Sequence, residues 1–461
     1  MLTGCFAGCK KTEETDETQI STAQGEDDPL VTLLPDKTYD KDFVILTHEG
    51  FSQDQYLVCH ELNGEPLNQV SVDRTLYLEE RFGINISVQE NPDLTTLLGN
   101  AHMAGDREYD LIEPHPTDGI VNLMVSGYFA NLLDMPYQYT DREWWNQSMV
   151  ENYSTNGKLY LGVCDFTIAS QSLLALVYNR DMYKAYGFTD DLHDVAMSGD
   201  FTVEYLKQIL INCKSDGNIE EENATYGLLF QTNSSRRWMY ALGQRILTKD
   251  AQGKFAVALE SEPVTDLCSG LYGLLYQSGD VMVATTGANA TFANSNYWAT
   301  FKGGRALFSA YNVGSLYNLL RDLSFDVGYL PLPKLDEDQN EYLVVEASGM
   351  VALPALMKDE EMSSVVLEAL AICSYQDMRP AFFETILMGR LSENPDDYEM
   401  LEFLHESKFY DFGFTLDSDS VALGIINFAV VNSQNPDSAA RYLSSNKRAL
   451  NAIADLANTI Q

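Results

Sequence analysis

Two short runs decide the fold: residues 156–166 read NGKLYLGVCDF and residues 173–183 read LLALVYNRDMY. The opening Asn-Gly pair is a turn signal, and Lys158–Val163 predicts a short strand. Leu173–Tyr178 is an apolar run of strand length, and Asn179 is a suitable N-cap for a helix that ends before Gly187. Two strands that meet at a polar joint, the second leading into a helix, suit a chain that crosses from one domain into another.

The size and charge of the chain limit what it does. Its 461 residues favour two domains over one core. Its 68 acidic and 29 basic residues give a formal net charge of −39. Nucleic acids and anionic membrane surfaces attract basic proteins, so neither is expected as a partner. We interpret the surplus as a solvated acidic surface, with cation binding as the alternative. No apolar run is long enough for a transmembrane helix.

The N-terminal residues MLTGC resemble the lipobox of bacterial lipoproteins, in which the cysteine carries the lipid. Cys5 is therefore the expected lipidation site, with Cys9 of FAGC as second choice, and two chance cysteines as the alternative. The basic and apolar regions of a signal peptide do not precede it, which is expected if the sequence begins inside a longer precursor. Lys10–Pro29 is polar and acidic and predicts a disordered tether behind that anchor.

Seven cysteines are scattered along the chain without a C-x-x-C pair or zinc-finger spacing. Cys164, Cys268 and Cys373 have apolar neighbours and are expected to be small core residues. The helix predicted over Asp141–Glu151 carries Trp144 and Trp145, for which we expect packing rather than binding, since adjacent helical residues diverge by about 100°.

Strands and helices alternate from Asp42 onward. Strands are predicted at residues 43–47, 84–88 and 109–112, and helices at residues 67–82, 93–104 and 118–125. This order indicates βαβ units and a mainly parallel sheet, whose ligands bind beyond the carboxyl ends of the strands. The loops at His48–Gly50 and Glu113–Thr117 therefore lie where a ligand is expected.

The second half continues this alternation and then becomes helical. Strands are predicted at residues 226–230, 305–309 and 325–330, with at least one more in 342–353. Helices are predicted at residues 202–214, 236–242, 263–277, 297–303, 362–375, 379–388, 396–406, 421–431 and 436–456. Residues 305–309 are a second candidate crossing between domains, followed by a helix that Tyr311-Asn312 opens.

Several motifs in one order resemble those of the extracellular solute-binding proteins of carbohydrate ABC importers. The opening stretch is similar to the family's first crossover, "gk-Y-g-p … L-x-YN-x-d". Tyr109–Ile112 resembles its "yDl" strand, and Gly127–Leu132 resembles its "G-x-l-x-dL" turn. Lys302–Phe308 resembles its second crossover, and Val327–Lys334 its "G-x-lP-x-Pk" segment. The resemblance covers residues 40–375, and the helical tail adds little to it.

This resemblance implies a periplasmic-binding-protein-like two-lobe α/β fold of type II, each lobe a mixed, mainly parallel sheet flanked by helices, with a helical C-terminal tail. The implied division is a lipobox and tether at residues 1–38, a first lobe of residues 39–163 plus 309–354, and a second lobe of residues 164–308 plus 355–461. The implied function is capture of an extracellular sugar or oligosaccharide by lobe closure, with delivery to ABC permease subunits. The protein is expected to be a lipid-anchored monomer on the outer face of the bacterial cytoplasmic membrane, without a cofactor.

Sugar binding needs aromatic faces for stacking and polar groups for the hydroxyls. Side chains at strand ends and in the loop after residue 230 supply both. The expected binding set is Glu49, Glu113, His115, Asp165, Gln231, Arg236, Trp238 and Tyr311. Neither His48-Glu49-Gly50 nor the segment EPHP at residues 113–116 follows the family's pattern, which leaves the ligand open.

No catalytic residue is expected. Paired carboxylates of a glycosidase are available in Glu49, Glu113 and Asp165, but acidic residues this abundant make such pairs inevitable. The chain lacks a G-x-S-x-G elbow, a GxGxxG loop and a Walker A motif. Asp110, Glu113 and His115 do not form a helical metal motif, so no metal is expected. The alternatives kept open are a surface polysaccharide-active enzyme or adhesin, and a sensor partner of a membrane kinase.

Overall fold

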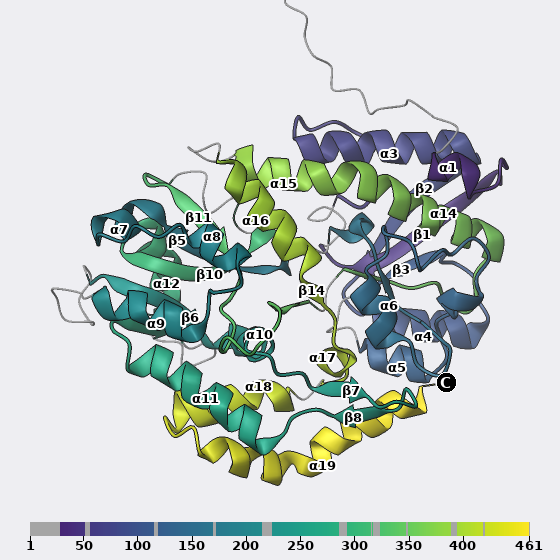
Figure 1. Ribbon diagram of the computed structural model, residues 1–461. Coiled ribbons are helices and arrows are strands. Elements are labelled where there is room, and N and C mark those ends of the chain that lie inside the picture. Colours follow the sequence, from purple (N-terminus) through teal and green to yellow (C-terminus); the bar gives the residue numbers. More distant parts are fainter. Residues whose placement is uncertain are drawn as a thin grey trace, which may run out of the picture.

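The computed structural model describes residues 28–50, 56–114, 119–168, 172–213, 224–284, 293–314, 316, 323–346, 349–388, 394–417 and 420–460. Figure 1 shows two lobes, with the first sheet on the right and the second on the left, and β14 between them. The predicted two-lobe α/β fold is confirmed. His115 and both candidate lipidation sites, Cys5 and Cys9, lie outside the described residues.

The first lobe has a parallel sheet in the order β2-β1-β3, formed by Lys41–His48 (β1), Ile84–Asn91 (β2) and Leu111–Glu113 (β3). Helix α3 (Pro66–Phe82) ends at Gly83, whose φ of 59° is the left-handed C-cap conformation that glycine adopts without a Cβ clash. Helix α4 (Leu94–Ala104) begins where the Asp93 carboxylate accepts the Thr96 N–H. These local signals produce the βαβ alternation expected from the sequence.

The tryptophan pair of the first lobe precedes its helix instead of lying within it. Helix α6 (Gln147–Tyr153) begins after Asn146, whose side chain accepts the Met149 N–H, so the expected start at Asp141 is wrong. Both Trp144 and Trp145 are buried, as expected from packing. The same lobe contains α5 (Ile120–Val125).

The second lobe has a mixed five-stranded sheet in the order β11-β5-β10-β6-β9. Its strands are Leu174–Asn179 (β5), Tyr226–Gln231 (β6), Val281–Ala284 (β9), Ala306–Asn312 (β10) and Val327–Leu330 (β11). Strand β5 runs antiparallel to β10 and β11, whereas β6 is parallel to β9 and β10. Its helices are α7 (Arg180–Ala185), α8 (Leu192–Met197), α9 (Val203–Asn212), α10 (Ser235–Ala241), α11 (Ser261–Tyr276) and α12 (Ala293–Lys302), and a hairpin joins β7 (Leu247–Lys249) to β8 (Phe255–Val257).

Short strand pairs join the segments that pass between the lobes. Strand β4 (Gly162–Val163) pairs with β13 (Met350–Val351), and β12 (Val344–Val345) pairs with β14 (Lys408–Phe409). Strands β10 and β11 lie inside the second sheet, so the expected assignment of the whole range 309–354 to the first lobe does not match the strand pairing. The chain returns to the first lobe only near β13, which pairs with β4. A short motif resemblance does not reveal the sheet partner of a strand, so the sequence did not show this.

The C-terminal helices are shared between the lobes. Helix α14 (Glu360–Cys373) packs on the first lobe, where Gln138 Nε2 donates to the Ser364 carbonyl at 2.7 Å, although the sequence assigned it to the second. A π-helical turn (Ser374–Met378) leads into α15 (Arg379–Met388) and α16 (Pro395–Glu406). The remaining helices are α17 (Phe412–Leu416), α18 (Val421–Ile426) and α19 (Ser438–Thr459).

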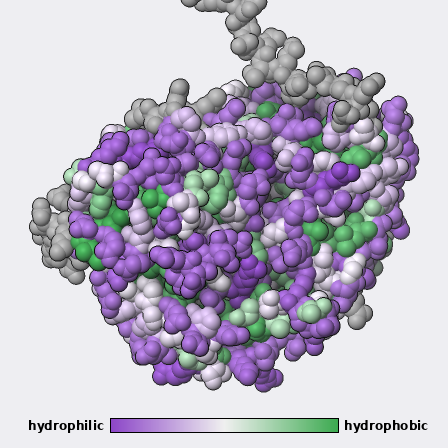
Figure 2. All heavy atoms as spheres, viewed as in Figure 1, coloured by the Kyte–Doolittle hydropathy of each residue, from purple (hydrophilic) through white to green (hydrophobic). Residues whose placement is uncertain are grey.

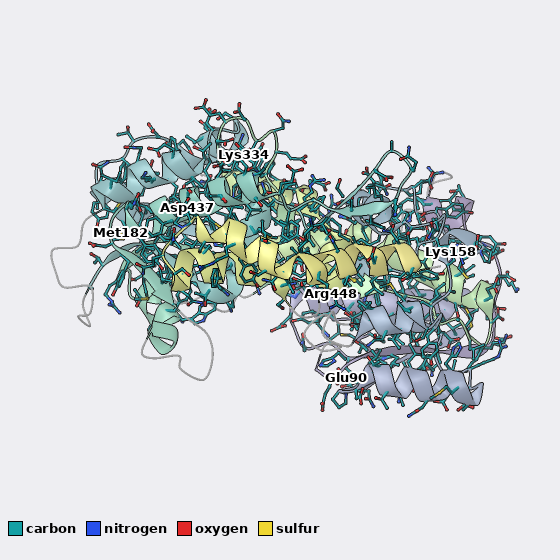
Figure 3. All side chains as sticks on the ribbon, turned by 90° about the horizontal axis from the view of Figure 1, so that it is seen from below. Glu90, Lys158, Met182, Lys334, Asp437 and Arg448 are labelled. Atoms are coloured by element: carbon teal, nitrogen blue, oxygen red, sulfur yellow. The ribbon has the colours of Figure 1, made fainter. Side chains whose placement is uncertain are left out.

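Helix α19 lies beneath both lobes. In Figure 3 it runs from Asp437 under the second lobe to the vicinity of Lys158 in the first. At that end, Asn156 Nδ2 donates to the Ile460 carbonyl at 3.3 Å, while Asn458 bonds to Phe255 of β8. The tail therefore holds the two lobes together at a second place besides the crossing segments.

The first residues that the structure describes are also part of the first lobe. Helix α1 (Pro29–Thr32) is capped by Asp28, and Leu30 and Leu34 are buried. Residues 28–38 were expected to belong to the tether, but Leu30 accepts a hydrogen bond from Arg81 of α3 and Lys37 pairs with Glu361 of α14. The rest of the expected tether lies outside the described residues. On the face of the molecule that Figure 2 shows, most residues are hydrophilic and the hydrophobic ones form small separate patches. Within the described ranges, no helix combines the length and apolar character needed to cross a bilayer.

Candidate functional site

The carboxyl ends of β1 and β3 in the first sheet, and of β10 in the second, lie near the crossing segments, whereas the antiparallel β5 begins there. In the second sheet Asn312, the last residue of β10, pairs with Leu174, the first residue of β5 after the crossing. In the first sheet Ile112 bridges to Ala352, so Glu113 lies beside the point where β13 enters that lobe. Because ligands of α/β sheets bind beyond the carboxyl ends of the strands, the region between the lobes is the candidate site.

The first lobe contributes fewer available side chains than expected. Glu113 is only 1% exposed, and the Thr47 hydroxyl donates to its carboxylate across the β1–β3 pair. It therefore stabilises the strand ends and offers little surface to a ligand in this conformation. Glu49 is exposed just beyond β1 and stays a candidate.

The second lobe brings three polar side chains to its carboxyl edge. Gln231 ends β6 and is partly exposed, and Asn312 ends the neighbouring β10. Arg237, one turn into α10, donates from Nη1 to the Asn312 Oδ1 at 3.2 Å. This hydrogen bond joins α10 to the end of β10 and places a cation at the strand edge. Gln231 belongs to the expected binding set, whereas Asn312 and Arg237 do not.

Arg236 points away from this edge toward the C-terminal segment. Its Nη1 donates to the Phe414 carbonyl at 3.3 Å, and its guanidinium lies 4.0 Å from the centroid of the Phe414 ring. The Asp417 carboxylate lies 4.0 Å away. Burial lowers the pKa of Arg236, and the charge of Asp417 opposes this shift. Arg236 therefore joins α10 to α17, and these contacts account for it without a ligand.

The two aromatic residues expected to stack on a ligand are buried. Trp238 is 0% exposed, with its ring centroid 5.5 Å from that of Phe230. Tyr311 is 2% exposed and belongs to β10 instead of opening a helix. In this conformation neither ring presents a free face, because both fill the layer between the second sheet and its helices.

Trp298 of α12 is the exposed aromatic residue that the sequence interpretation missed. Its ring lies 4.4 Å from that of Tyr311, at an interplanar angle of 31°, and the side chain is 38% exposed. The neighbouring Tyr297 is buried and packs edge-on against Tyr311 at 5.6 Å. Trp298 thus covers the end of β10 as the outer layer of an aromatic stack. The adjacent pair Tyr297-Trp298 was visible in the sequence, but the sequence does not show which of the two rings faces outward.

Asp165 lies in the first crossing segment, after β4, among charged residues of α15, α16 and β14. Its carboxylate is 3.7 Å from His405 Nε2, and His405 and Lys408 are both nearly buried. Burial raises the pKa of Asp165, and the charges of Lys408 and Arg379 oppose this effect. Burial also lowers the pKa of His405 well below its usual value, and Lys408 and Arg379 lower it further. These groups therefore couple the crossing segments electrostatically where the lobes meet.

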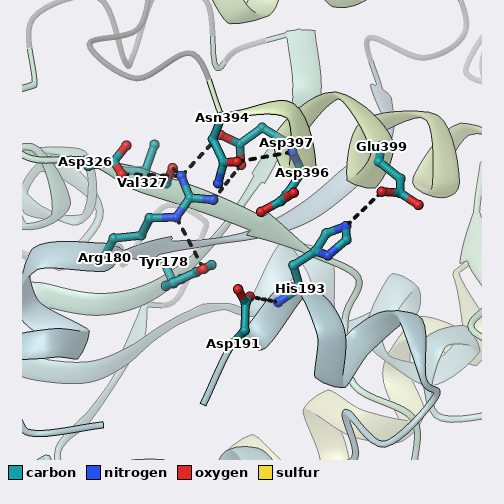
Figure 4. Close-up of polar contacts among 10 residues, drawn as sticks. All are labelled: Tyr178, Arg180, Asp191, His193, Asp326, Val327, Asn394, Asp396, Asp397 and Glu399. Atoms are coloured by element: carbon teal, nitrogen blue, oxygen red, sulfur yellow. Dashed lines mark hydrogen bonds and ion pairs between the residues drawn. The ribbon is translucent and has the colours of Figure 1, made fainter. Parts of the chain in front are cut away.

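A second charged network holds α16 on the second lobe (Figure 4). Arg180, which follows β5, makes two hydrogen bonds to Asp397 at 2.8 and 3.1 Å. The same guanidinium donates to the Val327 carbonyl at 2.6 Å and lies 3.4 Å from the Asp326 carboxylate. His193 of α8 contacts Glu399 of α16 at 3.6 Å. Together these contacts fix α16 to the second lobe.

The described residues supply no metal centre. Within the part of the chain that the structure covers, no three His, Cys, Asp or Glu side chains converge to hold a metal ion. The structure places Gln231 at the end of β6 in the second sheet and Glu49 just beyond β1 in the first sheet. Asp165 lies in the crossing segment between them, whereas Trp238 and Arg236 face the interior of the second lobe.

Comparison with known proteins identifies the family. The sequence profile described as "Bacterial extracellular solute-binding protein" matches residues 77–367. No curated protein sequence matches the chain.

Solved structures share the fold at low sequence identity. The substrate-binding protein Lmo0181 of Listeria monocytogenes, in complex with cycloalternan, has a TM-score of 0.55 at 12% identity, over 89% of this chain and 99% of that one. The MalE domain of Bdellovibrio bacteriovorus, bound to maltotriose, gives 0.53 at 16%, over 90% and 98%. UgpB of Mycobacterium tuberculosis, in complex with glycerophosphocholine, gives 0.56 at 14%, over 90% and 98%. With a profile that matches more than half of its length and the two-lobe fold of these binding proteins, the chain belongs to the bacterial extracellular solute-binding proteins.

Proposed function

We propose that this protein captures a sugar or oligosaccharide outside the cell by closure of its two lobes and delivers it to the permease of an ABC importer. Family membership supports a binding role on the extracellular side. Structural relatives that hold cycloalternan and maltotriose support a carbohydrate as the solute. The short crossing segments support closure, because lobes joined at such segments rotate about them as hinges.

The stack of Trp298 on Tyr311 carries the carbohydrate assignment. An exposed indole face binds the C–H side of a sugar ring, and a second ring behind it fixes its orientation. Gln231 and Asn312 end the neighbouring strands β6 and β10, and their amides both donate and accept hydrogen bonds, as sugar hydroxyls do. Trp238, which the sequence favoured for stacking, has no part in this proposal.

A panel of mono- and oligosaccharides, with amino acids and polyamines as controls, tests this function by thermal shift and by tryptophan fluorescence. We expect one carbohydrate class to raise the melting temperature and to change the emission of Trp298. Trp298→Ala should abolish the response, Trp298→Phe should retain part of it, and Met103→Ala, at a residue 73% exposed in the first lobe, should leave it unchanged. Carbohydrate binding that Trp298→Ala leaves intact would place the site elsewhere.

The same incubations separate binding from catalysis. A binding protein returns the sugar unchanged, whereas a polysaccharide-active enzyme releases shorter products, which chromatography of the mixture detects.

We further propose that the protein is a lipoprotein anchored through Cys5, with Cys9 as second choice. Replacement of Cys5 by alanine in the native gene should move the protein from the membrane fraction to the medium. Unchanged membrane association would reject Cys5 as the anchor.

A further inference from the structure

The guanidinium of Arg237 lacks most of the acceptors it requires. A guanidinium has five N–H donors, and among the described residues Arg237 has one hydrogen bond, from Nη1 to Asn312. Its Nε is buried without any acceptor, whereas Nη2 is not among the buried atoms. No carboxylate of the described chain lies within 4.0 Å of it. A covered N–H without an acceptor is unfavourable, so this side chain is held in place with one edge of its guanidinium unsatisfied.

Some partly buried arginines of the chain are better satisfied, whereas Arg81 of α3 resembles Arg237 in having, among the described residues, one hydrogen bond, to the Leu30 carbonyl, and a buried Nε without an acceptor. Arg180 has two bonds to Asp397, and Arg236 has the Asp417 carboxylate and the Phe414 ring. The buried Arg74 donates to Ser374 and to the carbonyls of Tyr56 and Leu57. In a chain with 68 acidic residues, carboxylates are abundant. Within the described part of the chain, Arg74 and Arg81 also lack a carboxylate partner, but both lie on α3 of the first lobe, whereas Arg237 lies at the carboxyl edge of the second sheet, within the candidate site.

We infer that Arg237 recognises an anionic group on the solute, and that the ligand is an acidic carbohydrate whose carboxylate, sulfate or phosphate meets the free edge of this guanidinium. The inference rests on the proposed function, since it concerns the same site. Asn312 occupies Nη1 and so leaves Nε–H and Nη2–H, which point in the same direction along one edge. That edge matches two oxygens of an oxyanion, whereas a single hydroxyl satisfies only one of the two donors.

The acidic surface does not oppose this assignment. At an ionic strength of 0.15 M the field of an exposed charge decays over about 8 Å, so distant carboxylates repel an incoming anion weakly. The nearby guanidinium dominates at contact distance. The anion satisfies Nη2 first, and a small rotation of the guanidinium brings Nε to its second oxygen. Binding should therefore weaken as salt is added, which neutral sugar binding does not do.

Titration calorimetry with four probes tests the inference: a galacturonic acid trimer, a sulfated disaccharide, a sugar phosphate and neutral maltotriose. We expect at least one anionic probe to bind more tightly than maltotriose, and its identity tells carboxylate, sulfate and phosphate apart. Arg237→Gln should weaken that probe about tenfold or more, since a charge-assisted bidentate contact is lost. Arg237→Lys should restore part of the affinity. Arg448→Gln, which removes the same charge from an exposed position on α19 (Figure 3), should have no effect.

Three results would overturn the inference. Maltotriose binding that exceeds every anionic probe and is unchanged in Arg237→Gln would leave the proposed function intact and remove the anion. An anionic probe whose affinity falls equally in Arg237→Gln and Arg448→Gln would show attraction by overall charge, without a site at Arg237. Absence of binding by all four probes and by the saccharide panel, with the protein folded, would reject the proposed function together with the inference.

Discussion

The buried carboxylate of Glu368 provides the sharpest prediction about stability. Glu368 lies on α14, is 0% exposed, and accepts the indole N–H groups of Trp144 at 2.6 Å and Trp145 at 3.0 Å. Burial raises its pKa from 4.5 to about 7, although both indole hydrogen bonds oppose the shift. Between pH 4.5 and about 7, Glu368 therefore stays mostly protonated in the folded protein, whereas in the unfolded chain it is mostly ionised.

The sign and size of the effect follow from this shift. A group whose folded-state pKa is raised contributes stability that is complete below the unfolded pKa and is lost as the pH rises through the folded one. At about 1.4 kcal/mol for each pH unit, the rise from 4.5 to about 7 corresponds to about 3 kcal/mol. Glu368→Gln cannot ionise. The free energy of unfolding of the wild type minus that of Glu368→Gln should therefore fall by about 3 kcal/mol between pH 4.5 and 8.

Urea unfolding of both proteins at half-unit pH steps measures this difference, in which the other titrating groups cancel. Glu360→Gln on the same helix is the matched control, because it makes the same substitution at an exposed position. A flat difference curve for Glu368→Gln, or one that rises with pH, would refute the argument. It would also weaken the assignment of α14 to the first lobe, since the hydrogen bonds of Glu368 to Trp144 and Trp145 join this helix to that lobe.

The remaining predictions concern the core and the lobe junction. Trp238→Ala should lower the free energy of unfolding by about 3–5 kcal/mol, since it empties a fully buried site; near wild-type stability in a urea melt would contradict its burial. Arg180→Ala should cost about 3–5 kcal/mol, because Asp397, 1% exposed, loses its charge partner, and hydrogen exchange should increase in α16; unchanged exchange there would argue against this anchor. His405 has a lowered pKa, so its stability contribution is present above the unfolded pKa and is lost as the pH falls below it. His405→Gln should therefore lose less stability than the wild type between pH 7 and 5, and parallel pH profiles would count against a neutral buried His405.

Local signals in the sequence determine most of the fold. Asn179 caps α7, Asp93 caps α4 and Gly83 ends α3, each at the expected position. Such signals act over a few residues, so they are visible without a structure. The sheet partner of β10 and the lobe that holds α14 depend on contacts hundreds of residues apart, such as the one between Glu368 and Trp144. No local pattern records them, and the division of the chain between lobes differed from expectation for this reason.

The binding residues were harder to predict than the fold. Whether an aromatic ring on a helix is buried or exposed depends on which face of the helix packs on the sheet. Trp238 of α10 is buried for this reason, and Trp298 of α12 is exposed. The loop after β6 was correctly expected at a strand end, but of its two consecutive arginines only Arg237 contacts that edge. Consecutive side chains on a helix point in different directions, and sequence alone does not fix which one faces a ligand.

A crystal structure of the complex with the saccharide that gives the largest thermal shift tests the central claim most directly. We expect a sugar ring against Trp298, with hydroxyl or acidic groups of the ligand near Gln231, Asn312 and Arg237, between the two lobes. A saccharide bound on the outer face of either lobe, or a complex in which Trp298 makes no contact with the ligand, would contradict it.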